Sequence, residues 1–213
     1  MRTCSFNLSP KEESFFNVMN RVSCMTMKQA TLFLRKYLSC SESQATWIIQ
    51  NLSNHQAITI SKDKTYITVG SISKAAHALI NLKTIRAMHV CIDLVDSLND
   101  MLFTHIPSDN TDLVFLAGQQ MYKVIEFRLN ENYKITAMQQ AYLDFMGQTQ
   151  RQSNGKSSFS YITLFTVPSS EDKDKVLEYF ESVNINFPAA IAYFNTDKAD
   201  EKADYELFKL SLE

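Results

Sequence analysis

The amino-acid sequence predicts a mixed α/β protein: an N-terminal winged helix-turn-helix, then a helical segment, then a mixed α/β sheet domain. Three observations predict this class. Three short amphipathic stretches precede two β-branched stretches in residues 1–70, an apolar helical period runs through residues 72–103, and strand and helix patterns alternate thereafter. The predicted domains of the 213-residue chain are 1–70, 71–104 and 105–213.

Three helices are expected in the predicted winged helix-turn-helix. In each of them apolar residues recur every third or fourth position, and a Ser or Thr stands where an N-cap is favoured. Pro10 directly follows Ser9, which is typical of a helix start. The expected helices are residues 10–22, 26–38 and 41–54, with N-cap candidates Ser9, Thr26 and either Ser41 or Ser43.

Two strands joined by a turn are expected directly after the third helix. β-branched residues alternate with polar ones over 57–60 and again over 65–69, which is typical of half-buried strands. The residues between them, Ser-Lys-Asp-Lys, predict a turn with a basic tip. Three helices and a hairpin in this order predict the winged helix-turn-helix.

The helical segment, residues 72–103, predicts one or two amphipathic helices. Such helices often pair two copies of a winged-helix regulator, which would place two reading helices on symmetric half-sites of DNA. The same apolar stripe could equally pack on the chain's own sheet. A homodimer is therefore one expected assembly, and the sequence leaves both alternatives open.

Strand and helix patterns alternate in the last predicted domain, which indicates a central sheet covered by helices. Its expected strands are residues 113–117, 121–127, 159–167, 189–194 and 206–212. Its expected helices are residues 135–146, ended by Gly147, and 170–182, capped by Ser169 or Ser170. The polar stretch 148–157 is expected to be an exposed loop.

Charge is distributed unevenly along the chain. The net charge is −2, yet residues 1–70 contain eight basic and four acidic residues, which makes this part +4 and the remainder −6. A polyanion such as DNA would therefore be tolerated only by the N-terminal part.

Several kinds of site and location are disfavoured by what the sequence lacks. No apolar run reaches the roughly 18 residues of a membrane span, and the N-terminus has no signal-peptide stretch, so we expect a cytoplasmic protein without a membrane partner. The four cysteines form no CxxC pair and the four histidines are scattered, so no metal site is expected. Neither GxGxxG nor a P-loop occurs, and no cofactor is expected.

Part of the N-terminal sequence resembles the winged helices of bacterial replication–relaxation proteins, which plasmids and conjugative elements carry. The matching segments are MTMKQATLFL, SESQATWIIQNLSNHQAITIS and KTYITVG. The second half resembles an uncharacterised bacterial family of the same layout, through DLVFLAGQQMYKVIEFRL and FPAAIAYFN. The resemblance implies a DNA-linked role in mobile-element biology. We therefore expect a non-enzymatic DNA-binding protein that acts in transcription or replication control.

The third predicted helix is the candidate reading helix for double-stranded DNA. Its outward side chains are mostly Gln, Asn and Thr, which can pair with adenine or contact a thymine methyl group. Basic side chains on the second helix and at the turn between the strands could hold phosphates. The expected base contacts are Gln44, Thr46, Trp47, Gln50 and Asn51, and the expected phosphate contacts are Lys28, Arg35, Lys36, Lys62 and Lys64.

Two other functions stay open. The reading helix carries no Lys or Arg, and phosphate contacts usually dominate DNA affinity, so the winged helix could instead contact a protein partner through Trp47. The third function is that of a degenerate metal-dependent nuclease. Asp109 or Asp112 with Glu126 loosely matches the carboxylate pair of such enzymes, which hold Mg²⁺. Arg128 stands where they need a Lys, and Arg stays charged at neutral pH, so we expect no catalytic residue.

Overall fold

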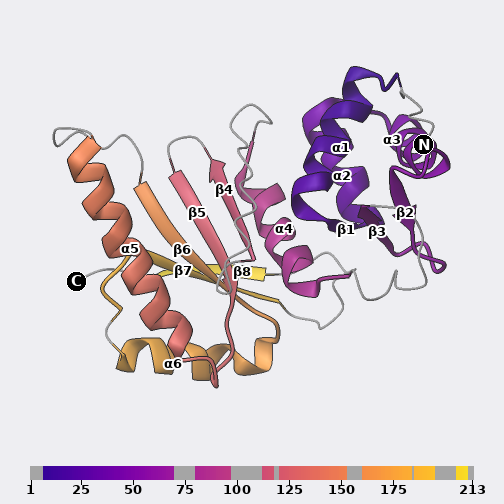
Figure 1. Cartoon of the computed structure of the whole chain (residues 1–213). Helices are drawn as coiled ribbons and strands as arrows, with labels where there is room; N and C mark the ends of the chain where they lie inside the picture. Colours follow the sequence, from indigo (N-terminus) through magenta and orange to yellow (C-terminus); the bar gives the residue numbers. More distant parts are fainter. Residues whose placement is uncertain are drawn as a thin grey trace. The chain divides into compact units, whose positions relative to one another are not determined.

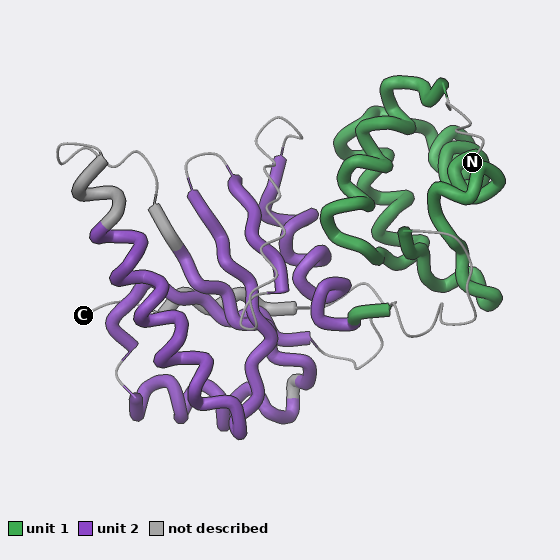
Figure 2. The backbone as a smooth tube through the Cα atoms, in the orientation of Figure 1, with its two compact units in different colours: residues 1–81 green, residues 82–213 purple. Residues whose placement is uncertain are grey.

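The computed structural model of the chain describes residues 7–69, 80–96, 112–117, 120–152, 160–183, 185–194 and 205–210. These residues form a mixed α and β structure with two compact units, Met1–Asn81 and Leu82–Glu213, drawn in green and purple in Figure 2. Each unit has a sheet of its own. Among the helices in the described ranges, none combines the length and apolar character needed to cross a membrane. The mixed α and β class predicted from the sequence is confirmed.

The described part of the first unit contains three helices and a three-stranded antiparallel sheet (Figure 1). The strand order is β1-β3-β2, so the short strand between the first two helices pairs with the second strand of the hairpin. In chain order the elements are α1 (Pro10–Val22), β1 (Cys24–Thr26), α2 (Met27–Leu38), α3 (Glu42–Asn54), β2 (Ile58–Ile60) and β3 (Tyr66–Val69). All three predicted helices and both predicted strands are present.

A reciprocal side-chain cap, the capping box, begins each of these helices. The N-cap hydroxyl accepts a hydrogen bond from the backbone N–H three residues on, and the Glu or Gln at that position accepts one from the N-cap N–H. The pairs are Ser9 with Glu12, Thr26 with Gln29, and Ser41 with Gln44. The predicted N-caps are confirmed, and each contributes about 1 kcal/mol to stability.

The strand β1 is not predicted by the sequence. Its three residues are all buried, so they show none of the alternation that marks a half-buried strand. Its extended backbone depends on pairing with β3, where Met25 lies opposite Ile67. Ser23 makes the turn that leads into it, with a φ of 68°.

The helices of the first unit enclose an apolar core. Phe15 of α1 and Phe33 of α2 are fully buried, with ring centroids 6.0 Å apart. Ile49 and Leu52 anchor α3 in the same unit. Burial of each such side chain stabilises the fold by about 1.5–3 kcal/mol. Because α3 is held by its apolar face, its opposite face is left to solvent.

The second unit is built on a five-stranded mixed sheet in the order β4-β5-β6-β7-β8. The three central strands are parallel, and the two edge strands are antiparallel to their neighbours. In chain order the elements are α4 (Leu82–Leu94), β4 (Leu113–Ala117), β5 (Gln120–Glu126), α5 (Tyr133–Gln152), β6 (Ser160–Val167), the 3₁₀ helix η3 (Ser170–Asp172), α6 (Lys173–Ser182), β7 (Ala189–Phe194) and β8 (Tyr205–Leu210).

Helices cover both faces of this sheet (Figure 1). α5 and α6 connect the parallel strands and pack on one face, through a core of aromatic and aliphatic side chains. α4 packs on β4 and β5. Because side chains alternate along a strand, Ile125 and Phe127 enter the core under α5 and α6, while Glu126 points to the other face and meets Arg86 of α4.

The helix α5 is longer than predicted. The sequence places its end at Gly147 and an exposed loop over 148–157, but the helix continues through Gly147 to Gln152. Glycine commonly ends a helix by taking a left-handed conformation, and Gly147 has no such φ. The Gln and Arg residues that follow favour a helix. The prediction was therefore wrong for 148–152, and residues 153–159 lie outside the described part of the chain.

The helix α4 is shorter than the helical segment predicted over 72–103. Residues 80–81 and 95–96 are not helical, and residues 70–79 and 97–111 lie outside the described ranges. Three residues of the predicted apolar stripe, Ile85, Met88 and Ile92, are buried in the second unit. This part of the stripe therefore packs within the chain.

The helix predicted over 170–182 begins with a 3₁₀ turn. Ser169 Oγ accepts a hydrogen bond from the Glu171 N–H at 3.2 Å, which stabilises that turn. The α-helix itself starts at Lys173, with Asp172 as an N-cap whose side chain makes no capping hydrogen bond. The predicted cap at Ser169 thus serves the 3₁₀ turn and not α6.

Candidate nucleic-acid interface

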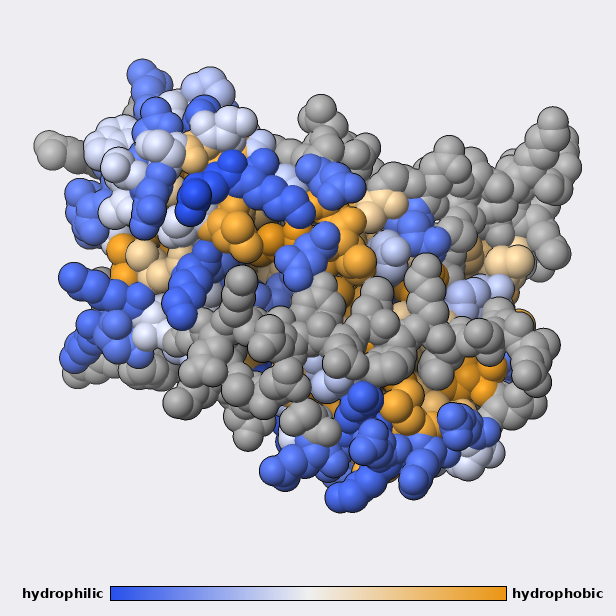
Figure 3. Space-filling model, turned by 180° about the vertical axis from the view of Figure 1, so that it is seen from behind, coloured by the Kyte–Doolittle hydropathy of each residue, from blue (hydrophilic) through white to orange (hydrophobic). Residues whose placement is uncertain are grey.

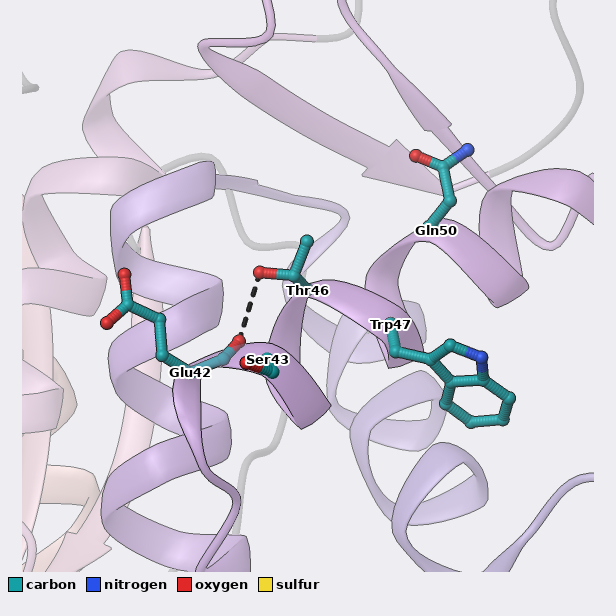
Figure 4. A pocket seen from close by; sticks show the side chains of 5 residues that line it. All are labelled: Glu42, Ser43, Thr46, Trp47 and Gln50. Carbon is teal, nitrogen blue, oxygen red and sulfur yellow. Dashed lines mark hydrogen bonds between the residues drawn. The ribbon is translucent and has the colours of Figure 1, made fainter.

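The exposed face of α3 is the surface that the sequence predicts to meet DNA. Five side chains line a shallow hollow on it: Glu42, Ser43, Thr46, Trp47 and Gln50 (Figure 4). The indole of Trp47 and the amide of Gln50 project away from the helix, and Trp47 is 59% exposed. An indole offers a large apolar surface and one N–H donor, so this side chain is available to a partner.

Some of the polar side chains on this face form hydrogen bonds within α3. Thr46 Oγ1 donates to the Glu42 carbonyl at 3.0 Å, and Gln50 Nε2 donates to Asn54 Oδ1 at 3.1 Å. Both bonds are exposed, and such bonds contribute only about 0.5–1.5 kcal/mol each, so a bound partner could replace them. Thr46, Trp47 and Gln50 therefore lie on one accessible surface, where the sequence places them.

Two other predicted base contacts, Gln44 and Asn51, form hydrogen bonds within the first unit. Gln44 Oε1 accepts the Ser41 N–H at 2.9 Å in the capping box. Asn51 is half-buried, and its Nδ2 donates to Glu12 Oε1 at 2.5 Å. Glu12 is only 3% exposed, so this bond lies inside the unit. Asn51 thus joins α3 to α1 and does not face outward as the sequence predicts.

We expect Asn51→Ala to lower the free energy of unfolding by about 1–3 kcal/mol at neutral pH, because it leaves Oε1 of the buried Glu12 carboxyl without its hydrogen-bond donor. Burial raises the pKa of that carboxyl, but hydrogen bonds from Asn51 and Ser9 outweigh it and hold the pKa below its ordinary value. Ionised Glu12 therefore stabilises the fold above its unfolded-state pKa, and this contribution is lost as pH falls through the lower folded-state pKa. Urea unfolding at neutral pH and at about pH 3 measures the effect, and the difference between wild type and variant should shrink in acid.

Asn54→Ala is the matched control for this prediction. Asn54 is exposed, and its hydrogen bond joins it only to Gln50 in the same helix. Asn54→Ala should lower the free energy of unfolding by no more than about 0.5 kcal/mol. If Asn51→Ala cost no more than Asn54→Ala, or if its cost were the same in acid, Asn51 would not have the role described here.

All five predicted phosphate contacts are exposed on the first unit. They are Lys28, Arg35 and Lys36 on α2, and Lys62 and Lys64 in the turn between β2 and β3. The described residues of this unit carry seven basic and four acidic side chains, a net charge of +3. A surface of this sign attracts a polyanion.

The turn between β2 and β3 has a defined backbone that presents its two lysines. The Lys64 N–H donates to the Ser61 carbonyl at 2.9 Å, and Lys64 has a φ of 58°. Hydrogen bonds from Ser61 and Thr65 lower the pKa of the Asp63 carboxyl, which therefore stays ionised at neutral pH. With Lys62, Asp63 and Lys64 all charged, the turn has a net charge of +1.

The second unit brings together two carboxyl-bearing residues of the nuclease-like hypothesis. Asp112 Oδ2 accepts the backbone N–H of Glu126 at 2.5 Å, and burial raises the pKa of the Asp112 carboxyl. Asp109 lies outside the described residues. The sequence predicts that Glu126, if not a metal ligand, points outward or pairs across strands. It is instead fully buried.

Two guanidinium groups hold the Glu126 carboxylate. Arg86 binds Oε2 through Nη2 and through Nε at 3.0 Å, and Arg128 binds Oε1 through Nε at 3.2 Å and Nη2 at 3.1 Å. A divalent cation at this carboxylate would face two fixed positive charges at close range. Within the described ranges, no three His, Cys, Asp or Glu side chains group as metal ligands would. This geometry disfavours a metal-dependent nuclease that uses Asp112 and Glu126.

Sequence reasoning did not single out Arg86, Lys134 or Glu12, all of which are at least nine-tenths buried. Lys134 Nζ donates to the Glu126 carbonyl and to the Glu131 carboxylate, both at 2.6 Å. Arg86 stands next to Ile85, on the apolar side of α4. A basic residue beside an apolar stripe is the one signal that could have pointed to it.

Hydrophobic side chains reach the surface in places, as orange areas among blue ones (Figure 3). Large exposed examples are Leu32, Leu82, Tyr133 and Leu143. Apolar side chains that are exposed singly are ordinary on protein surfaces and need no functional explanation. Trp47 differs from them because it stands on the polar face of α3.

Comparison with known proteins gives no match for this chain to a family model, a curated protein or a solved structure.

Proposed function

We propose that the first unit, Met1–Asn81, is a winged helix-turn-helix domain that binds double-stranded DNA without catalysing a reaction on it. The element order α1-β1-α2-α3-β2-β3 and the hairpin after α3 suit such a domain. The observation that carries the proposal is that α3 buries its apolar face and presents an exposed polar face, within a unit whose described residues carry a net charge of +3.

In the proposed complex α3 lies in the major groove. The Gln50 amide pairs with adenine, and the Thr46 methyl group contacts a thymine methyl. Trp47, which is 59% exposed, packs on the groove edge beside them. Asn51 is left out of this set, because Glu12 holds its amide inside the unit.

Phosphate contacts in the proposed complex come from α2 and the β2–β3 turn. α3 itself has no Lys or Arg, and Glu42 in its first turn repels phosphate. Lys62 and Lys64 are exposed at the tip of the turn, which would act as the wing that meets the DNA backbone. Binding of this kind is strongly dependent on salt, because each phosphate contact releases a counterion.

The resemblance of the sequence to replication–relaxation proteins suggests the setting in which this binding would act. A non-enzymatic DNA-binding unit would serve transcription or replication control of a mobile element.

A protein contact through α3 is the second candidate function. It is favoured by one observation, the exposed Trp47 indole on a helix face that has no cation and carries Glu42. Tryptophan is enriched among the residues that dominate binding at protein interfaces. In this alternative the same face docks a protein, and the lysines of the turn play no part.

Fluorescence-anisotropy titration of a labelled random duplex with the full chain, at several salt concentrations, tests the DNA proposal. Lys62→Ala combined with Lys64→Ala removes two phosphate contacts. We expect weaker binding to every DNA sequence, and a decrease of about 2 in the magnitude of the slope of log K against log salt.

Lys11→Ala combined with Lys175→Ala is the matched control, since it removes the same charge from exposed positions outside α2 and the turn. Its salt slope should equal that of the wild type. Absence of salt-dependent binding by the wild type would overturn the DNA proposal. Capture of a protein partner that is lost in Trp47→Ala but kept in the double lysine variant would establish the second candidate.

A further inference from the structure

The second unit has a cleft where β5 and β6 end. Its volume is about 460 Å³, and it is lined by Leu82, Arg86, Arg128, Pro168, Ser169 and Asp172. Arg128 follows β5, and Pro168 and Ser169 follow β6, so the cleft lies at the carboxyl ends of two neighbouring parallel strands. Open α/β sheets bind their ligands at this end, and the volume is in the range of small-molecule sites.

Arg86 and Arg128 both line the cleft, and a buried carboxylate orients their guanidinium groups. Each binds the buried Glu126 carboxylate through its Nε and Nη2 atoms, as described above. The Nη1 atoms of Arg86 and Arg128 make no hydrogen bond with the described residues, so each guanidinium keeps donors for a further acceptor. Glu126 thereby holds both side chains in place before any ligand binds.

The charges around the cleft favour an anion. Arg86, Arg128 and the Glu126 carboxylate between them sum to +1, and Arg86 is only 5% exposed, so solvent screens its charge little. Asp172 is the acidic side chain in the lining. It is 52% exposed and lies 4.0 Å from Lys175 Nζ, so solvent and Lys175 both weaken its repulsion.

The donors come from three separate segments: Arg86 from α4, Arg128 from the end of β5, and the Ser169 hydroxyl from the end of β6. A tetrahedral oxoanion can present a different oxygen to each of three donors, whereas a carboxylate has only two oxygens. Guanidinium groups match phosphate oxygens particularly well. Leu82 and Pro168 add an apolar part to the lining, which suits an organic group attached to the phosphate.

We propose that this cleft binds the phosphate group of a small organic phosphate ester, with Arg86, Arg128 and Ser169 as donors and Leu82 and Pro168 against the organic part. This site is in the second unit and is independent of the proposed DNA surface. The proposed site binds the phosphate ester without catalysing a reaction on it.

Isothermal titration calorimetry of the full chain with phenyl phosphate, inorganic phosphate and benzoate tests the site. We expect one phenyl phosphate per chain, bound several-fold more tightly than inorganic phosphate, and weaker binding of benzoate. Arg128→Gln should weaken phenyl phosphate binding roughly tenfold or more, because it removes a charged donor. The Arg128 side chain is 58% exposed, so this variant is expected to fold, and circular dichroism checks that it does.

Arg21→Gln is the matched control, since it removes an exposed guanidinium on α1, away from the proposed phosphate contacts, and should leave the affinity for phenyl phosphate unchanged. Ser169→Ala is a second variant, expected to weaken binding several-fold. The proposal is overturned if the wild type shows no saturable binding, if Arg128→Gln binds as the wild type does, or if benzoate binds as tightly as phenyl phosphate. An equal loss in Arg21→Gln would place the bound phosphate on the first unit and would also overturn the proposal.

Discussion

Replacing Arg86 by Met is expected to destabilise the second unit by about 3–5 kcal/mol. The substitution keeps a long side chain at this buried position of α4 but removes the charge that faces Oε2 of Glu126. Glu126 is fully buried, and Arg128, its other partner, has a side chain that is 58% exposed. A buried carboxylate that loses its buried partner cannot recover its hydration, so most of the desolvation cost remains.

Urea unfolding followed by circular dichroism measures this loss, and two further variants locate its cause. Arg128→Met removes the exposed partner and should cost about 1 kcal/mol or less, as exposed ion pairs do. Glu126→Gln combined with Arg86→Met removes the buried charge as well, and it should regain a large part of the lost stability. If Arg86→Met and Arg128→Met cost the same, burial would not be what makes the Arg86 pair important.

The second large effect is expected at the aromatic core beneath α5 and α6. Phe165→Ala should lower the free energy of unfolding by about 3–5 kcal/mol, through lost burial and the cavity that remains. Phe165 of β6 is fully buried, and its ring centroid lies 5.6 Å from that of Phe127, 4.8 Å from that of Phe180 and 6.3 Å from that of Phe187. The denaturant midpoint of unfolding measures the change.

Leu143→Ala is the matched truncation for Phe165→Ala. Leu143 lies on α5 in the same unit but is 53% exposed, so its loss should change stability by no more than about 0.5 kcal/mol. Phe165→Leu should cost less than Phe165→Ala, because more of the cavity is filled. Equal costs for Phe165→Ala and Leu143→Ala would contradict the core described here.

The function of the proposed DNA surface depends on where its charges lie as much as on the shape of α3. α3 presents Thr46, Trp47 and Gln50 to solvent, but the cations stand on α2 and on the β2–β3 turn. If α3 reads bases, the affinity for DNA depends on Lys62 and Lys64. If the face docks a protein, the affinity for that protein depends on Trp47 and not on these lysines. The salt dependence of the double lysine variant separates these two functions without knowledge of the DNA site.

Elements that depend on neighbours in sequence could be predicted closely. The N-caps Ser9, Thr26 and Ser41 each bond to a residue three positions on, so the start of each helix is encoded within four residues. The end of α5 could not be predicted in this way. Gly147 has the residue type of a helix end, but its backbone stays helical and α5 continues past it.

By itself, the sequence determined the mixed α and β class, the order of the helices and of every described strand except β1, the apolar face of α3 and the positive charge of the first unit. Each of these follows from local periodicity or from composition. Only the tertiary structure decided which polar side chains are buried. Asn51 bonds to Glu12 across 39 positions, and Arg86 bonds to Glu126 across 40. A buried charge persists only where the fold brings a partner to it, and no pattern along the chain encodes a pairing at that separation.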